Sequence, residues 1–492
     1  MRPAANVVGG VDAVAREAPE RVALIAADTR LTYRQLARRA GGFARWLEGR
    51  GIRAGGRVAL VLPNGVAFAI ALYGALRRGV TVAPLNPQLT AEERARILAD
   101  FSPDAVIDSP RIVMDAAVGA QNAADGAEIA ADGADAMAHA GAPALVLYTS
   151  GTTGRPKGAV LSHAAVRAGN ASWMGPVMAL RSADRVLAVL PLSHSYGING
   201  ALLAPLLAGA TVVILERFAP EAVIAAIREH RVTVFPGVAT MFQRILDAGC
   251  FTRDDFAPVR LALSGAAPCP WPLADAWRQR TGVRILRGYG MTELHRPLSY
   301  LADDPRDFPE CVGCPVPGVE LRLVDDSGAD VPRGEVGELL IRTDAAMDGY
   351  LSQPEETEAA MKDGWFRTGD LARLSDEGFV SIVGRKKELI LRGGYSVYPP
   401  EVEAALLAHP AVAEAAVVGV PDTELGEEIV AFVRPRPGLA VTPGDLVAWC
   451  QARVAGYKCP RAVSLVADFP RSATGKILKP ALAQLAATPA RS

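Results

Sequence analysis

The stretch YTSGTTGRPKGAVLSH, residues 148–163, gathers hydroxyl, glycine and basic residues into one short loop after an apolar run, ALVL at 144–147. Glycines let backbone N–H groups turn toward an anion, hydroxyls add donors, and Arg155 and Lys157 add positive charge. A Walker loop needs Gly-Lys followed by Ser or Thr, whereas a proline precedes Lys157 and a glycine follows it. The stretch therefore predicts a polyphosphate-binding loop of a different kind.

The composition of the 492-residue chain indicates large buried cores, because half of its residues are hydrophobic and 21% are charged. Its net charge of −1 lacks the basic excess of nucleic-acid binders, so we expect no nucleic-acid partner. The N-terminus lacks an unbroken apolar signal region, and no run of about 18 apolar residues predicts a membrane span. Six scattered cysteines indicate free thiols in a reducing compartment, so we expect a cytoplasmic protein.

Strand and helix patterns alternate along the first two thirds of the chain, which indicates an α/β sheet. Residues 31–51 show helical spacing with Thr32 as N-cap, and 57–64 reads as a buried strand. The helix at 66–79 is closed by Gly79. Residues 111–143 are rich in Ala, Gly and Asp with weak periodicity, so we expect a surface connector there.

The pattern changes after about residue 310 to shorter alternating runs, which predict antiparallel strands. The last hundred or so residues combine helical runs at 399–412 and 444–454 with strand-like runs between them. We predict an α/β fold with a large, multi-subdomain N-terminal domain of mixed sheets, residues 1–384. A small α+β domain, residues 385–492, would follow a hinge near 384–388.

Further segments carry chemistry at strand ends and in glycine loops. GYGMTE, residues 288–293, places an aromatic ring, a hydroxyl and a carboxylate together. Its tyrosine could stack on a purine, its threonine could bind a phosphate oxygen, and its glutamate could hold Mg²⁺. PLSHSYG at 191–197 offers a histidine, and RTGD at 367–370 offers a carboxylate suited to ribose hydroxyls. Basic residues surround glycines at 384–403 and around TGK at 474–476.

Taken together and in this order, these motifs resemble the AMP-forming acyl-CoA synthetase and adenylating-enzyme superfamily, which includes peptide-synthetase adenylation domains and beetle luciferase. The resemblance covers nearly the whole chain. It implies two half-reactions. A carboxylate first attacks the α-phosphate of MgATP, giving an acyl-adenylate and pyrophosphate, and a thiol then displaces AMP. The implied cofactors are ATP, Mg²⁺ and coenzyme A.

The resemblance also implies roles for individual residues of the nucleotide site. The β- and γ-phosphates would be held by Thr149, Ser150, Gly151, Thr152, Thr153, Gly154 and Lys157. The adenine would lie between Tyr289 and the segment Gly265, Ala266, Ala267 and Pro268. Thr292 would touch the α-phosphate, Glu293 would bind Mg²⁺, and Asp370 with Arg385 would hold the ribose.

The small domain would supply the groups that change between the half-reactions. Lys476 would bridge the substrate carboxylate and the α-phosphate, where a cation counts most as negative charge builds at phosphorus. Lys476 must then leave so that a thiol can approach. Rotation about the hinge residue Lys387 would remove it and bring Gly393-Gly394 to the pantetheine tunnel.

The acid would bind to residues from the stretches near 194–200, 235–241, 264–267 and 288–295. This pocket comprises Ser195, Tyr196, Gly197, Asn199, Phe235, Val238, Met241, Gly288 and Met291, and His194 would gate it and orient the carboxylate. Ser195 cannot neutralise an amino-acid ammonium.

Malonate-activating relatives carry an arginine where this chain has Gly288, so we expect an open, uncharged floor and an apolar monocarboxylate, either a fatty or an aryl acid. A polar group of the substrate could meet His295 and Arg296, but we expect these two to face solvent or pack structurally.

Three other interpretations remain at this level. The acceptor could be the pantetheine of an acyl carrier protein rather than CoA, and turnover with free CoA separates the two. A non-catalytic nucleotide-binding relative is disfavoured by the intact Lys476, Glu293 and Lys157. No residue specifically supports a luciferase-like oxygenase. The oligomeric state, monomer or homodimer, is not legible in the sequence.

Overall fold

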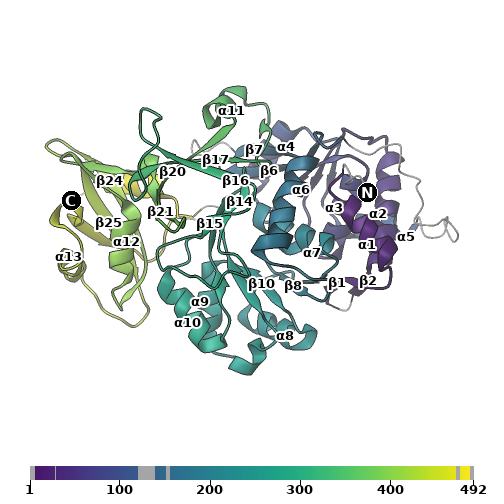
Figure 1. The fold of residues 1–492 in the computed structure, drawn as a ribbon, viewed down its shortest axis with the longest axis horizontal. Helices are drawn as coiled ribbons and strands as arrows, with labels where there is room; N and C mark the ends of the chain where they lie inside the picture. Colours follow the sequence, from purple (N-terminus) through teal and green to yellow (C-terminus); the bar gives the residue numbers. More distant parts are fainter. Residues whose placement is uncertain (1–5, 28, 120–138, 151–155, 472–476, 488–492) are drawn as a thin grey trace. The chain divides into compact units, whose positions relative to one another are not determined.

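The computed structural model describes residues 6–27, 29–119, 139–150, 156–471 and 477–487 of the chain (Figure 1). The chain divides into two compact units. One comprises Met1–Leu321 with Ile341–Phe366, and the other comprises Arg322–Leu340 with Arg367–Ser492. The predicted domain boundary between residues 384 and 385 stays a prediction.

A seven-stranded sheet lies in the first unit, in the order β12-β11-β10-β8-β9-β1-β2. Strand β2 is antiparallel to β1, and the other neighbouring pairs are parallel. Its strands are β1 (Val22–Ala26), β2 (Thr29–Thr32), β8 (Arg185–Ala188), β9 (Thr211–Ile214), β10 (Val234–Gly237), β11 (Leu261–Ser264) and β12 (Ile285–Leu286). The helices that contribute to its core are α8 (Pro220–His230), α9 (Ala239–Ala248) and α10 (Trp271–Thr281) (Figure 1).

A six-stranded sheet, in the order β18-β7-β6-β4-β3-β5, lies in the same unit. Strands β6, β4, β3 and β5 are parallel, whereas β7 and β18 add antiparallel strands at one edge. Its strands are β3 (Arg57–Leu60), β4 (Thr81–Pro84), β5 (Ala105–Ile107), β6 (Pro143–Ser150), β7 (Pro156–Ser162) and β18 (Gly349–Tyr350). The predicted polyphosphate loop therefore connects β6 to β7.

The helices of the first third follow the sequence patterns with one correction. They are α1 (Gly9–Glu17), α2 (Tyr33–Glu48), α3 (Val66–Arg77), α4 (Ala91–Phe101), α5 (Pro110–Gly119) and α6 (His163–Ser172). Thr32 caps α2 in a capping box with Gln35, as predicted. The expectation of a surface connector from residue 111 is wrong for its first part, because α5 buries Val113 and Ala117 completely. Residues 120–138 lie outside the described residues.

Two π-helical turns and a small sheet complete the first unit around the predicted acyl pocket. The turns are η2 (Trp173–Val177) and η3 (Gly197–Leu203), and α7 (Ala204–Leu207) continues the second. The sheet consists of β13 (Gly288–Met291), β14 (His295–Ser299) and β15 (Cys314–Pro315), all antiparallel. Such π-turns are rare and occur frequently at functional sites.

The remaining strands form two five-stranded sheets. The first consists of β16 (Val319–Val324), β17 (Val336–Thr343), β19 (Met361–Lys362), β20 (Trp365–Leu374) and β21 (Val380–Arg385), with α11 (Pro354–Ala360) preceding β19. The second consists of β22 (Ile390–Arg392), β23 (Tyr395–Val397), β24 (Val412–Asp422), β25 (Gly426–Pro435) and β26 (Ala462–Leu465). Helices α12 (Pro399–Leu407), α13 (Pro443–Gln451) and α14 (Lys479–Ala487) contribute to the cores beside the second sheet.

The predicted α/β class with mixed sheets is confirmed, and the runs after residue 310 form the expected strands. All six cysteines are free thiols. Within the described part of the chain, none of the helices combines the length and the apolar content that a bilayer crossing requires.

Candidate active site

The β6–β7 hairpin presents the two ends of the predicted phosphate loop side by side. Thr149 and Lys157 are paired across the hairpin, and Ser150 pairs with Pro156. The side chain of Thr149 donates to the Lys157 carbonyl over 3.5 Å. Residues Gly151, Thr152, Thr153 and Gly154, which the sequence assigns to the phosphates, lie outside the described residues. The described ends of the loop, Ser150 and Pro156, therefore face each other at the carboxyl end of β6.

Tyr350 links the two motifs that the sequence assigns to phosphate and metal. It lies on β18, which pairs with β7 so that Tyr350 is opposite Ala159. Its hydroxyl donates to Glu293 Oε1 over 2.9 Å, and Lys157 Nζ lies 5.2 Å from the centre of its ring. Burial and the neighbouring Glu293 carboxylate raise the pKa of the Tyr350 hydroxyl, so it remains a donor. One tyrosine therefore has the predicted phosphate lysine over its ring and the predicted metal carboxylate at its hydroxyl.

Lys157 also has an acidic partner within the first unit. Its Nζ forms an ion pair with Glu356 in the first turn of α11. Only 15% of the Lys157 side chain is exposed, compared with 46% for Glu356. The predicted phosphate lysine is thus paired with a carboxylate of the same unit.

Thr292 and Glu293 follow the last residue of β13 and are buried, 8% and 6% exposed. The Glu293 carbonyl accepts a hydrogen bond from the Met347 amide over 2.8 Å, which fixes the backbone at this point. Tyr289, two strand positions before Met291, is only partly buried. The GYGMTE segment therefore offers a partly open ring beside a buried hydroxyl and a buried carboxylate.

The predicted adenine segment leaves the carboxyl end of β11. Gly265 is buried, whereas Ala266, Ala267 and Pro268 are exposed. Ala266 has a φ of 64°, a left-handed conformation that is uncommon for a residue with a side chain. Exposed backbone at the end of a parallel strand suits contact with a ligand.

A backbone hydrogen bond holds His194 in one tautomer. Its Nδ1 accepts a hydrogen bond from the Tyr196 amide over 3.2 Å, so the neutral ring carries its proton on Nε2. Burial lowers the pKa of His194, which keeps the ring neutral near pH 7. The ring can therefore donate a hydrogen bond through Nε2.

Four of the predicted pocket residues lie together in and before η3. Tyr196 stacks on Trp173 with ring centroids 5.3 Å apart, and its hydroxyl donates to the Leu263 carbonyl. The Asn199 side chain bonds the Ser195 carbonyl and accepts from Asn170. Gly197 lies so close to the chain that a Cβ there would be 2.1 Å from the Pro191 oxygen. These contacts fix the histidine segment against the end of β11.

Two of the three predicted pocket residues from residues 235–241, Phe235 and Met241, pack in or against the hydrophobic core. Phe235 is fully buried, with its ring 5.1 Å from Phe242 and 6.2 Å from Trp277. Met241 packs against the same cluster, and Val238 is the residue before α9. The assignment of Phe235 to the pocket is corrected, because strand alternation turns this side chain toward α9 and α10.

The expected open, uncharged floor at Gly288 is also wrong. A Cβ at Gly288 would lie 2.3 Å from Cζ and Nη2 of Arg296, so the guanidinium lies directly against the glycine. Neither Arg296 nor His295 faces solvent, with 5% and 6% exposure. Pairing of β13 with β14 places Gly288 opposite Ser299, and the Arg296 side chain reaches back along this hairpin. Met291 pairs with His295 in the same hairpin and is partly buried.

The second unit contains the remaining predicted residues. Asp370 on β20 is paired with Arg385 on β21, and their side chains form an ion pair of 2.9 Å. Lys387 lies in a short 3₁₀ turn, Lys386–Glu388. Gly393 and Gly394 form the two-residue loop between β22 and β23 with φ of 56° and 84°, as a type I′ turn requires. Lys476 lies outside the described residues.

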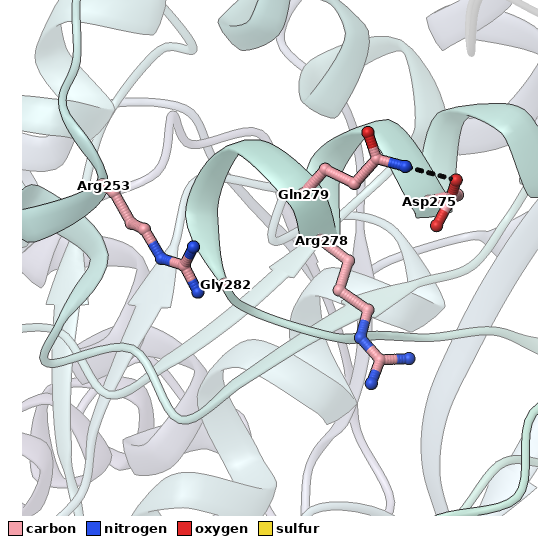
Figure 2. A pocket seen from close by; sticks show the side chains of 5 residues that line it. All are labelled: Arg253, Asp275, Arg278, Gln279 and Gly282. Carbon is pink, nitrogen blue, oxygen red and sulfur yellow. Dashed lines mark hydrogen bonds between the residues drawn. The ribbon is translucent and has the colours of Figure 1, made fainter.

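A surface pocket in the first unit is separate from these residues. Figure 2 shows that Arg253, Asp275, Arg278, Gln279 and Gly282 line it. The Gln279 side chain donates to Asp275 Oδ2 over 2.8 Å along α10. None of the five belongs to the predicted site.

Sequence reasoning missed Tyr350, Glu356 and Trp173. Tyr350 and Glu356 lie about sixty residues beyond Glu293, in a segment with no glycine or charge pattern typical of phosphate binding. Trp173 follows α6 in a π-turn that no simple periodicity predicts. Only strand pairing in the folded chain brings Tyr350 to Lys157.

Two protein-family models match most of the chain. The chain matches the AMP-binding enzyme family over residues 11–351 and the AMP-binding enzyme C-terminal domain over residues 401–476. It is 37% identical over 478 residues to a feruloyl-CoA synthase of an Amycolatopsis species, which covers 94% of this chain and 96% of that protein.

Two solved structures extend the likeness to three dimensions. ATP-bound MatB from Rhodopseudomonas palustris is 31% identical with a TM-score of 0.88, over 97% of this chain and 99% of that one. The o-succinylbenzoate CoA synthetase of Bacillus subtilis, in complex with its acyl-adenylate intermediate, is 30% identical with a TM-score of 0.84, over 96% and 97%.

Proposed function

The chain belongs to the AMP-binding enzyme family and is an acid–CoA ligase that works through an acyl-adenylate, and we propose that it activates an aryl acid with MgATP. The observation that carries the nucleotide part is the arrangement of Lys157, Tyr350 and Glu293 in one unit. A cation, a hydroxyl donor and a carboxylate are the groups that a metal-bound triphosphate needs.

Glu293 fits the donor set of Mg²⁺. This ion usually binds one or two protein carboxylates and takes its other ligands from phosphates and water. Glu293 is a buried carboxylate, and Tyr350 already orients one of its oxygens. Bound Mg²⁺ would neutralise phosphate charge and so lower the repulsion that the attacking carboxylate meets.

The residues of the first unit have complementary tasks in adenylate formation. Lys157 binds the β- and γ-phosphates as pyrophosphate departs, and Thr292 donates to the α-phosphate. His194 holds the acid carboxylate through Nε2–H, because its Nδ1 is occupied by the Tyr196 amide. Fixed donors of this kind stabilise charge as it develops and need no reorganisation during the step.

The second unit is proposed to hold the ribose and the thiol. Asp370 would accept from the ribose hydroxyls, with Arg385 holding its carboxylate in place. Lys476 would assist the first half-reaction, and movement about Lys387 would separate it from the second. The turn at Gly393-Gly394 would then admit the pantetheine of CoA, since no atom lies within 4 Å of a Cβ at Gly394.

An aryl acid is proposed over a long fatty acid for two reasons. Trp173, Tyr196 and Arg296 fill the space against Gly288 and Gly265 that a deep alkyl slot would occupy. Two similar proteins carry aromatic acids in their names, feruloyl-CoA synthase and o-succinylbenzoate CoA synthetase.

The test is pyrophosphate release from MgATP with benzoates, cinnamates and fatty acids of increasing length, each with and without CoA. We expect one or more aryl acids to dominate, and CoA to accelerate turnover with one AMP and one acyl-CoA formed per ATP. A preference for long fatty acids would contradict the aryl assignment. Pyrophosphate release that CoA leaves unchanged would instead point to a carrier-protein acceptor.

A further inference from the structure

Arg296 is the most unusual charged group near the predicted acyl pocket. Its Nε donates to Ser299 Oγ over 2.9 Å, Nη1 to the Ser264 carbonyl over 3.0 Å, and Nη2 to the Leu286 carbonyl over 3.1 Å. These carbonyls stand at the carboxyl ends of β11 and β12. The guanidinium is therefore fixed between two parallel strands, where ligands of α/β sheets bind.

Within the described part of the chain, Arg296 has no carboxylate partner. Another buried arginine of the first unit, Arg287, has one, because its Nη2 forms an ion pair with Asp307. Burial lowers the pKa of Arg296, and only the neighbouring Tyr196 acts in the opposite direction. Burial of a cation without a counter-ion costs free energy. A bound ligand could supply the partner that the folded chain does not.

Among the residues that the structure describes, two N–H groups of the Arg296 guanidinium have no hydrogen-bond acceptor. An arginine carries five N–H groups, and three of those of Arg296 are used by the serine hydroxyl and the two carbonyls. One N–H therefore remains on each of Nη1 and Nη2. Two neighbouring donors of this kind match an oxygen acceptor, and they match a carboxylate particularly well.

Arg296 lies against two glycines that the sequence assigns to the acyl and adenine sites. The Cβ positions of Gly288 and Gly265 would be 2.3 Å and 3.1 Å from its guanidinium. The Trp173 ring is centred 5.2 Å from its Cζ, and Tyr196 stacks on the Trp173 ring. Glycines without side chains and flat rings near the guanidinium are suited to an aromatic substrate ring that ends there.

We infer that Arg296 is a specificity-determining residue that selects aryl acids with an acceptor oxygen, a hydroxyl or a carboxylate, at the ring end remote from the reacting carboxylate. This inference rests on the proposed function. Its physical basis is that a buried donor left without a partner penalises any substrate that lacks the acceptor. The bulk of the guanidinium also limits the length of the acid.

A purely structural role for Arg296 makes a different prediction. If the guanidinium only joined β11, β12 and Ser299, its replacement would lower stability and affect all acids alike. If it recognises the acid, its replacement changes the ratio between matched acids. The ratio therefore distinguishes the two roles.

The experiment measures acid binding by calorimetry to the full chain with Mg²⁺ and α,β-methylene-ATP, which prevents turnover. The matched acids are cinnamate, 4-hydroxycinnamate and 4-carboxycinnamate, and the proteins are wild type, Arg296→Met and Arg296→Lys. Methionine keeps a long side chain without donors, and lysine keeps the charge with a different geometry. Ser299→Ala serves as a graded control, because it removes only the partner of Nε.

We expect wild type to bind at least one oxygen-bearing acid about 10- to 100-fold more tightly than cinnamate, as hydrogen bonds to charged groups allow. Arg296→Met should bring the ratio near one with little change for cinnamate, and Arg296→Lys should give an intermediate ratio. If 4-hydroxycinnamate shows the larger affinity ratio to cinnamate, the preferred acceptor is a hydroxyl, and if 4-carboxycinnamate does, it is a carboxylate. A wild-type ratio near one overturns the inference without any variant, and so does a ratio that Arg296→Met leaves unchanged.

Failure of the proposed function is visible separately. If none of these acids releases pyrophosphate yet the binding ratios are as expected, the proposed activation of aryl acids fails and the role of Arg296 in binding stands. If pyrophosphate is released from all three acids with equal kcat/KM in wild type, the proposed activation of aryl acids stands and the role of Arg296 is overturned.

Discussion

At the scale of single residues, the bond between Tyr350 and Glu293 is the clearest target. Tyr350→Phe keeps the ring over which Lys157 lies but removes the donor to Glu293 Oε1. A hydrogen bond to a charged group is worth about 1.5–3 kcal/mol, so kcat/KM for MgATP should fall by about tenfold or more. Pyrophosphate release at varied MgATP measures this.

A second tyrosine provides the control for that variant. The Tyr73 hydroxyl donates to Asp12 Oδ1 over 2.5 Å in the same unit, outside the predicted site. Tyr73→Phe removes a tyrosine–carboxylate bond of the same kind and should leave kcat/KM unchanged. An equal loss in both variants would show that Tyr350 acts only through stability.

Buried histidines make the stability of the protein depend on pH. Burial lowers the pKa of His163 and of His295 to about 4, with the Ala345 carbonyl partly opposing it at His295. In the unfolded chain both histidines have a pKa of about 6.5. Between pH 4 and pH 6.5 the unfolded state therefore binds more protons than the folded state. The free energy of unfolding therefore has its full value above pH 6.5. It decreases as the pH is lowered toward 4, by about 1.4 kcal/mol per pH unit for each histidine.

Urea unfolding at a series of pH values tests this dependence. His295→Asn should remove the contribution of one histidine from the slope of the free energy of unfolding against pH. Asparagine tolerates the φ of 58° found at His295. A slope unaffected by His295→Asn would mean that this ring is protonated in the folded state.

At the scale of elements, the hairpin of β13 and β14 positions Thr292, Glu293 and Arg296 together. Gly290 on β13 allows the facing backbone of β14 to approach closely, because a Cβ there would be 2.3 Å from the His295 carbonyl oxygen. Gly290→Ala should lower the free energy of unfolding by about 1–3 kcal/mol through overpacking, and lower pyrophosphate release further by displacing Glu293.

Urea unfolding of that variant and of Gly141→Ala gives the comparison. No atom lies within 4 Å of a Cβ at Gly141, so this second glycine should accept alanine with little change. Gly290→Ala with wild-type stability and activity would show that the hairpin can rearrange.

Local signals in the sequence were sufficient for most elements and insufficient for the contacts between them. The capping box at Thr32 and the left-handed Gly79 mark helix ends through backbone chemistry that a few neighbouring residues determine. Helix α5 was missed because small residues weaken its periodicity, although Val113 is buried.

The candidate site divides in the same way. Motif order was enough to nominate Lys157, Thr292 and Glu293, but the tyrosine between them depends on the pairing of β18 with β7. The guanidinium at Gly288 comes from a residue eight positions later, through a hairpin with a shift in register. Neither periodicity nor motif spacing in the sequence predicts this contact between the Arg296 side chain and Gly288.

At the scale of the whole molecule, the C-terminal region contains its own cores. The two apolar clusters beside the second five-stranded sheet draw all their members from residues 390–486. A fragment of residues 385–492 should therefore fold alone and unfold cooperatively, as circular dichroism during urea titration would show. A gradual, non-cooperative transition would mean that the fragment requires β20 and β21 from upstream.

If Lys157 binds the phosphates as proposed, its ion pair with Glu356 makes nucleotide binding an exchange of counter-ions. The triphosphate would then displace a carboxylate that neutralises the lysine, and added salt would weaken both the departing and the arriving pair. Because the two effects partly cancel, we expect the affinity for MgATP to change little with ionic strength. Glu356→Gln should tighten binding by about two- to fivefold at low salt and steepen its salt dependence. An equal dependence of MgATP affinity on salt in wild type and Glu356→Gln would contradict this prediction. It would mean that the phosphates bind away from Lys157.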